Sequence, residues 1–219
     1  FRGKRSCVCT NLNGILVYLI RNERREIMGK SIMIVGVGGQ GTLLASRILG
    51  NLLTSEGYDV KVSEVHGMSQ RGGSVVTYVK YGEKVESPII DEGEADLILA
   101  FEELEAYRWV PYLKKGGRII CNTQNIDPMP VIIGACEYPQ DIIAKIKAEN
   151  IDIIPVDAAA LALEAGNIKT VNVALLGVLS KSTEIPEEKW LKAVEKTVPA
   201  KAVEVNHAAF LKGREYAGN

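Results

Sequence analysis

The amino-acid sequence predicts an α/β fold: a Rossmann-like open, mostly parallel sheet with helices on both faces and a helical C-terminal part. Three observations lead to this fold class. Short apolar runs typical of buried strands alternate with segments of helical period, which is the pattern of a parallel sheet. A glycine-rich turn follows the first apolar run, and after residue 157 the pattern is helical to the end. With 219 residues, 47% of them hydrophobic, the chain can bury a sizeable core.

The individual elements follow from local patterns. Residues 31–35 are apolar and stop at Gly36, as expected of a buried strand, and residues 40–55 carry apolar side chains at helical spacing before Gly57. Alternating or β-branched runs predict the remaining strands at 60–65, 74–81, 96–101, 118–121, 131–133 and 151–156. Helical spacing predicts the remaining helices at 102–113, 141–149, 172–180, 187–196 and 201–212.

Residues 1–27 differ in composition from the rest of the chain. They hold six Lys or Arg against two Asp or Glu, a net charge of +4, whereas residues 28–219 carry a net charge of −5. They show no amphipathic period and no signal-peptide cleavage site, and residues 23–27 could be encoded by the purine-rich codons of a ribosome-binding site before Met28. We therefore expect residues 1–27 to be a non-native or disordered leader and residues 28–219 to form one domain. A genuine N-terminal extension is the alternative.

Charge, cysteine content and missing motifs exclude several classes of protein. A net charge of −1 argues against nucleic-acid binding, and no apolar run approaches the roughly 20 residues of a membrane span. The four cysteines, at 7, 9, 121 and 136, form no CxxC and suggest a reducing, cytoplasmic location without a metal site of their own. Walker A, GxSxG and HExxH motifs are absent from the sequence. No complete active site is visible, which favours a subunit of a larger enzyme.

The strongest local signal is the turn GVGGQG at 36–41, whose glycines match GxGxxG between a strand and a helix. Glycines permit positive φ and close approach, so the N–H groups at the start of the helix can face an anion. Alternatively, the glycines only allow a tight turn. Glu64 is the candidate for an acidic ribose ligand, but the unusual loop after it argues against an NAD site. The candidate cofactor-binding residues of the turn are Gly36, Gly38, Gly39, Gln40 and Gly41.

The second glycine-rich segment, HGMSQRGG at 66–73, follows the second predicted strand. It falls at the C-terminal edge of the predicted sheet, where open α/β folds bind ligands. Arg71 is suited to hold an anion or carboxylate, with a structural salt bridge as the alternative. The catalytic residues are unknown, and the candidates are His66 and Arg71. The alternative for His66 is a hydrogen-bonded loop residue. We expect His207 to be structural. The candidate binding residues of this segment are Gly67, Ser69, Gln70, Arg71, Gly72 and Gly73.

The two segments carry a family resemblance. GVGGQGTLLASRILG (36–50) and VKVSEVHGMSQRGGSV (60–75) resemble the gamma domain of 2-oxoacid:ferredoxin oxidoreductases. The EVHGMSQRGG form is most similar to the beta subunits of the indolepyruvate ferredoxin oxidoreductases of archaea and anaerobic bacteria. The likeness continues through 92–117, 121–124, 171–180 and 203–214, so it covers residues 28–219 as one gamma-type domain and none of 1–27.

This resemblance implies a function. It implies a subunit of an enzyme that converts aryl 2-oxoacids, coenzyme A and oxidised ferredoxin into aryl-acyl-CoA, CO2 and reduced ferredoxin. Thiamine diphosphate and iron–sulfur clusters are then expected on the partner alpha subunit and no cofactor on this chain, which would be inactive alone. Its glycine segments would contact coenzyme A or only form the interface. The alternatives are a gamma subunit for pyruvate, 2-oxoisovalerate or 2-oxoglutarate, a free-standing nucleotide-binding dehydrogenase, and a purely structural assembly subunit.

Overall fold

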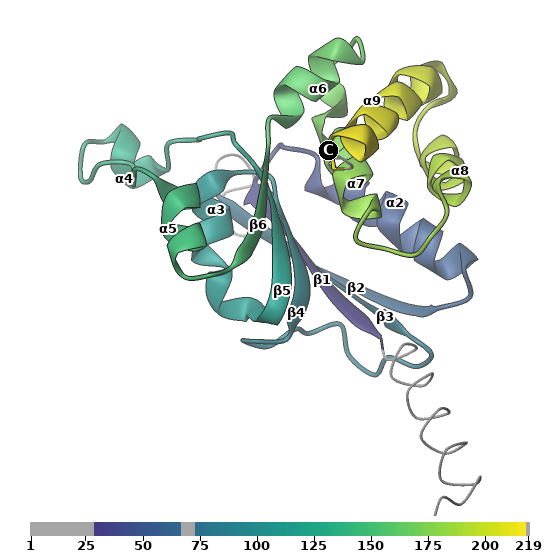
Figure 1. The fold of residues 1–219 in the computed structure, drawn as a ribbon, viewed down its shortest axis with the longest axis horizontal. Coiled ribbons are helices and arrows are strands. Elements are labelled where there is room, and N and C mark those ends of the chain that lie inside the picture. The colour runs from purple at the N-terminus through teal and green to yellow at the C-terminus, as the bar shows by residue number, and fades with distance from the viewer. Residues whose placement is uncertain (1–28, 67–72, 218–219) are drawn as a thin grey trace, which may run out of the picture.

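The computed structural model describes residues 29–66 and 73–217. The expected leader at 1–27 and most of the second glycine segment, residues 67–72, lie outside the described residues. Within the described part, six strands form one sheet in the order β2-β3-β1-β4-β5-β6 (Figure 1). The strands are β1 (Lys30–Val37), β2 (Asp59–His66), β3 (Ser74–Gly82), β4 (Ala95–Ala100), β5 (Leu113–Asn122) and β6 (Asp152–Val156).

The sheet is mostly parallel, as predicted, with one reversed strand. β1, β4, β5 and β6 pair in parallel, whereas β3 is antiparallel to both of its neighbours, β1 and β2. β2 therefore runs in the direction of β1 without pairing with it. The register sets Val37, at the end of β1, opposite Ser74, at the start of β3. This pairing brings the glycine turn and the second glycine segment to the same edge of the sheet.

Helices cover both faces of the sheet (Figure 1). The helices of the described residues are α2 (Thr42–Ser55), α3 (Glu103–Arg108), α4 (Met129–Ile132), α5 (Ile142–Ala148), α6 (Ala158–Glu164), α7 (Val171–Ser180), α8 (Glu187–Thr197) and α9 (Val203–Tyr216).

The side chains of β1 alternate between the two faces. Ile32 and Ile34 join the core cluster formed with α2, α7, α8 and α9, whereas Met33 and Val35 join the cluster formed with α3 and α5. This is the two-residue period of a strand buried on both faces.

Two predicted elements differ from the structure. The segment 131–133 is not a strand, because it belongs to the single helical turn α4 and to the residue after it. Pro128 and Pro130 flank the start of this turn, where a missing N–H costs nothing and the fixed proline φ suits a helix. The helix predicted at 102–113 already ends at Arg108. A 3₁₀ turn containing Pro111 follows, and β5 begins at Leu113, five residues before the predicted strand.

The helical C-terminal part is closely packed. A Cβ atom added to Gly213 on α9 would lie 1.9 Å from the carbonyl oxygen of Ala174 on α7, and one added to Gly177 would lie 2.1 Å from the Phe210 carbonyl. The two helices thus approach to backbone contact, and Trp190 from α8 stacks on Phe210 with ring centroids 5.7 Å apart. Among the described residues, no helix combines the length and the apolar character needed to cross a membrane.

Candidate functional site

The glycine turn between β1 and α2 contains positions that need glycine for packing and one that is open. A Cβ at Gly36 would lie 2.8 Å from Gln40 Oε1, and one at Gly41, which has φ 84°, would lie 2.7 Å from Asn172 Nδ2. Gly39 has φ 100° and no heavy atom within 4 Å of such a Cβ. Gly36 and Gly41 therefore allow the turn to pack, and the exposed backbone of Gly39 is accessible to a ligand.

Gln40 holds the turn in shape. Its Oε1 accepts a hydrogen bond from the Val37 N–H at 2.7 Å, and its Nε2 donates to the Phe101 carbonyl at 2.9 Å and to Gln124 Oε1 at 3.1 Å. Asn122 Nδ2 donates to the same Phe101 carbonyl at 3.1 Å. The amide of Gln40 thus connects the glycine turn to the C-terminal ends of β4 and β5, which is a structural role.

The start of α2 is compatible with an anion. Gly41 caps the helix without a side-chain hydrogen bond, and the first turn of the helix contains no acidic residue. The positive end of the helix dipole therefore faces the turn, and no carboxylate in the first turn of α2 neutralises it.

The second glycine segment is flanked by described residues on both sides. The N–H of Gly38 donates to the carbonyl of Gly73 at 3.0 Å, and the backbone of His66 pairs with Val75. The backbones of the two glycine segments therefore meet through Gly38 and Gly73. The candidates Gly67, Ser69, Gln70, Arg71 and Gly72 lie outside the described residues, and for His66 only the backbone is described.

Glu64 does not have the position of a ribose ligand. In a dinucleotide-binding fold this acid lies at the end of the strand next to β1. Here β3 occupies that place, which sets Glu64 on β2 about 10 Å away by ordinary strand spacing. Its Oε1 accepts a hydrogen bond from Ser46 on α2 at 3.0 Å. His207 lies in α9 with its Nε2 3.0 Å from the Leu191 carbonyl oxygen, in keeping with the structural role expected for it.

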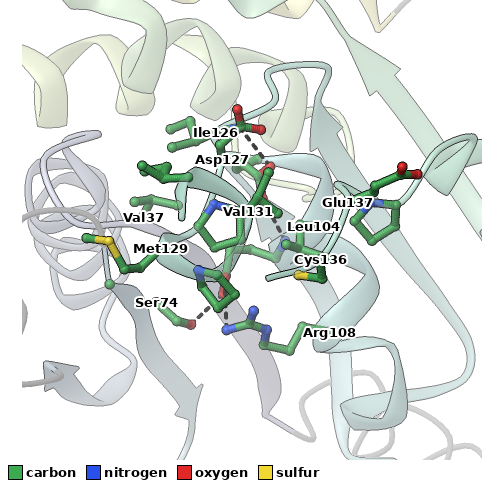
Figure 2. Close-up of a pocket in the computed structure, with 17 residues that line it drawn as sticks. Val37, Ser74, Leu104, Arg108, Ile126, Asp127, Met129, Val131, Cys136 and Glu137 are labelled. Atoms are coloured by element: carbon green, nitrogen blue, oxygen red, sulfur yellow. Dashed lines mark hydrogen bonds and ion pairs between the residues drawn. The ribbon is translucent and has the colours of Figure 1, made fainter. Parts of the chain in front are cut away.

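A cavity of about 680 Å³ opens beside the two glycine segments (Figure 2). Its lining is mostly apolar and comes from segments that are far apart in the sequence. Two residues belong to the glycine segments, one is the first residue of β3, four belong to α3 and its cap, and the others belong to the loop that carries α4. In that order they are Val37, Gly73, Ser74, Glu102, Leu104, Glu105, Arg108, Ile126, Asp127, Pro128, Met129, Pro130, Val131, Ile132, Cys136, Glu137 and Pro139.

Two buried carboxylates at the start of α3 hold the cavity walls, and the first is Glu102, which is 1% exposed. Its Oε2 accepts from the Glu105 N–H at 2.8 Å and so caps α3. Its Oε1 accepts from the Ile126 N–H at 3.2 Å and from the hydroxyl of Tyr138. Burial, and then this hydrogen bond, raise the pKa of Tyr138 above its usual range. Glu102 thereby attaches both ends of the α4 loop to α3.

The second carboxylate, Glu105, is 3% exposed and contacts the opposite wall. Its Oε2 accepts from the Ser74 hydroxyl at 2.5 Å, and its Oε1 pairs with Arg108 at 3.3 Å (Figure 2). Its Oε2 also accepts from Trp109 Nε1 at 3.3 Å. Ser74 comes directly after the second glycine segment. Sequence patterns did not indicate either glutamate, because a charged run at a helix start is typical of a solvated face.

The two described cysteines differ in environment. Cys136 is exposed at the cavity, while Cys121 is buried in β5, where burial raises the pKa of its thiol above the usual range. A buried, protonated thiol is a poor nucleophile. Within residues 29–66 and 73–217, no three His, Cys, Asp or Glu side chains gather as a metal site.

Comparisons with known proteins agree with this geometry. Residues 31–216 match the family model described as pyruvate ferredoxin/flavodoxin oxidoreductase. The indolepyruvate oxidoreductase subunit IorB of Thermococcus kodakarensis is 46% identical over 82% of this chain and 92% of that protein. IorB of Methanothermobacter thermautotrophicus is 36% identical over 85% of this chain and 96% of that protein.

Solved structures show the same fold. The pyruvate oxidoreductase subunit PORC from Thermotoga maritima aligns with a TM-score of 0.67 at 22% identity, over 86% of this chain and 96% of that one. A 2-oxoglutarate:ferredoxin oxidoreductase from Magnetococcus marinus aligns with a TM-score of 0.64 at 19% identity, over 87% of this chain and 31% of that one. The resemblance in the glycine segments is thus confirmed: the chain belongs to the pyruvate ferredoxin/flavodoxin oxidoreductase family, as an oxidoreductase subunit related to IorB.

Proposed function

We propose that this chain is the beta subunit of an indolepyruvate:ferredoxin oxidoreductase, which converts aryl 2-oxoacids and coenzyme A into aryl-acyl-CoA while reducing ferredoxin. The observation that carries the proposal is the 46% identity to an indolepyruvate oxidoreductase subunit over nearly its whole length. Relatives named for ketoisovalerate, or for pyruvate and ketoisovalerate together, are only 26–29% identical. This difference favours an aryl 2-oxoacid over the alternatives.

The chemistry is divided between two subunits in this proposal. Thiamine diphosphate and iron–sulfur clusters, assigned to the alpha subunit, would supply decarboxylation and one-electron transfer. The beta subunit would cover that site and keep water out of it. A cytoplasmic location belongs to the proposal, because the unpaired Cys121 and Cys136 suit a reducing compartment.

We assign a coenzyme A contact to the edge that carries both glycine segments. Three features support it: the open backbone at Gly39, the start of α2 without an acid in its first turn, and the mostly apolar cavity beside them. The first two suit the phosphates of coenzyme A, and the cavity suits its uncharged arm. The Magnetococcus marinus enzyme, 31% of whose chain aligns with this one, was solved with coenzyme A bound.

The proposal is tested with the co-expressed alpha–beta complex. We expect reduction of ferredoxin or a viologen dye that requires indolepyruvate, coenzyme A and both chains, with a higher kcat/KM for aryl pyruvates than for pyruvate or 2-oxoglutarate. A preference for pyruvate would refute the assigned substrate. Turnover by this chain alone, or tight binding of NADH in a fluorescence titration, would favour the free-standing dehydrogenase instead.

Arg71→Ala tests the coenzyme A contact within that complex. A charge-assisted hydrogen bond is worth about 1.5–3 kcal/mol, so we expect the KM for coenzyme A to rise about 10- to 150-fold with little change in Tm. Lys84→Ala is the control, because Lys84 is an exposed cation whose ion pair with Glu86 lies outside the cavity. An unchanged KM with a weakened complex would assign Arg71 to the interface, as in a purely structural subunit.

A further inference from the structure

The helix α4 presents a small apolar knob, which we define as Met129, Ile132 and Ile133. These side chains are 64%, 65% and 70% exposed, although they are among the largest apolar residues of the loop. α4 projects from the body of the domain beyond α3 and α5 (Figure 1). Three large apolar side chains are thus exposed within five residues, and exposed apolar clusters mark interaction sites.

The knob is held in place by the rest of the fold. The Ile126 N–H before α4 and the Tyr138 hydroxyl after it both donate to the buried carboxylate of Glu102. The N–H of Ala135 donates to the Pro130 carbonyl at 2.8 Å, which closes the loop behind the helix. The backbone of the loop is therefore already ordered before a partner binds, so binding loses little conformational entropy and the affinity is higher.

The charges of the segment that carries the knob are of one sign. Residues 119–144 contain no Lys, Arg or His, and the exposed acids Asp127, Glu137 and Asp141 flank α4. Arg108, on the other side of the cavity, is paired with the buried Glu105. A complementary surface would therefore be an apolar socket with Lys or Arg at its rim.

A second copy of this chain does not offer such a surface in a symmetric contact. A two-fold interface uses the same patch on both copies, so the acids around both knobs would gather in one contact. Like charges placed together cost free energy and disfavour that pairing. A different chain with a basic rim is therefore the favoured occupant.

We propose that the α4 knob is the anchor by which this chain docks on the larger alpha subunit, in an apolar socket rimmed by Lys or Arg. The identity of the partner rests on the proposed function, and the chemistry of the socket rests on the knob and its acidic flanks. In this arrangement the cavity, which α4 helps to line, opens toward the alpha subunit.

The test compares two exposed isoleucines in the co-expressed complex. Ile133→Asp changes the knob, and Ile89→Asp is the matched control, because Ile89 is 58% exposed and precedes β4 at the opposite edge of the sheet. Dilution of each complex, followed by mass photometry, gives the dissociation constant. We expect Ile133→Asp to raise it at least about 30-fold, as for an interface hot spot, and Ile89→Asp to leave it unchanged. Asp127→Lys should weaken the complex and reduce its dependence on salt.

The outcomes separate this inference from the function on which it rests. A complex with Ile133→Asp that dissociates like the wild type would overturn the anchor while the proposed function stands. If Ile133→Asp instead abolished self-association of the beta chain without affecting the alpha–beta contact, the occupant would be a second copy and the proposal would be wrong. Failure of the wild-type chains to associate at all would refute the proposed function, and the anchor with it.

Discussion

Glu102→Ala is expected to destabilise the domain far more than a typical change of a charged residue. The carboxylate is buried and accepts hydrogen bonds from the Glu105 N–H, the Ile126 N–H and the Tyr138 hydroxyl. Alanine would remove the cap of α3 and leave the other two donors without their acceptor. The α4 loop would then lose its attachment to α3 at both ends.

The size of the effect follows from these three contacts. Loss of an N-cap side chain costs about 0.5–2 kcal/mol, and a buried donor without a partner costs about 1–3 kcal/mol. Ile126 and Tyr138 are only partly buried, so water can replace part of each bond, and about 1 kcal/mol per contact is appropriate. The total of about 3 kcal/mol corresponds to a fall in Tm of about 6–12 °C for a domain of this size.

Glu103→Ala is the matched control, because it also removes one carboxylate at the start of α3. The pKa of Glu103 is raised by burial and by repulsion from Glu102, so both variants remove the same repulsion. Thermal unfolding followed by circular dichroism should show a large fall in Tm for Glu102→Ala and a small change for Glu103→Ala. Equal Tm values for the two variants would show that the three hydrogen bonds do not hold the loop.

Two further predictions concern packing and pH. Gly213→Ala should cost more than about 3 kcal/mol of stability, because its Cβ would overlap the Ala174 carbonyl, whereas Gly39→Ala should cost only the strain of positive φ, about 1–2 kcal/mol. Equal urea midpoints for the Gly213→Ala and Gly39→Ala variants would contradict this difference in stability. Burial, the largest cause for both, raises the pKa of Tyr138 and Tyr81 above the ordinary value of 10. The contribution of these two tyrosines to stability should therefore be constant below pH 10 and fall above it, where the unfolded chain loses those protons first. An absorbance titration in which every tyrosine of the native protein ionises near pH 10 would refute it.

Some features of the fold could be predicted from the sequence because they depend on neighbouring residues. The apolar run after Lys30 indicates a strand buried on both faces, and the glycine positions in GVGGQG indicate a tight strand-to-helix turn. The family likeness also resides in these local segments. The positive φ of Gly39 and Gly41 and the crowded position of Gly36 agree with the turn that the motif predicts.

Other features needed the tertiary structure. Val131, Ile132 and Ile133 favour a strand by their own preferences, but flanking prolines start a helical turn there, and no strand of the described sheet pairs with it. β3 inserts antiparallel between β1 and β2. This position could not be predicted, because strand pairing depends on which strands meet in space and not on the pattern within either strand. This insertion is what separates Glu64 from the glycine turn.

The candidate site shows the same division. The sequence by itself determined the positions of the glycine turn and the family to which they belong, since backbone sterics and apolar period act over a few residues. Only the tertiary structure decided that Glu102 and Glu105 are buried, that they bond to Tyr138 and Ser74 respectively, and that a cavity lies beside them. The physical reason is that burial and hydrogen bonding between distant segments depend on the packing of the whole domain, which no local pattern contains.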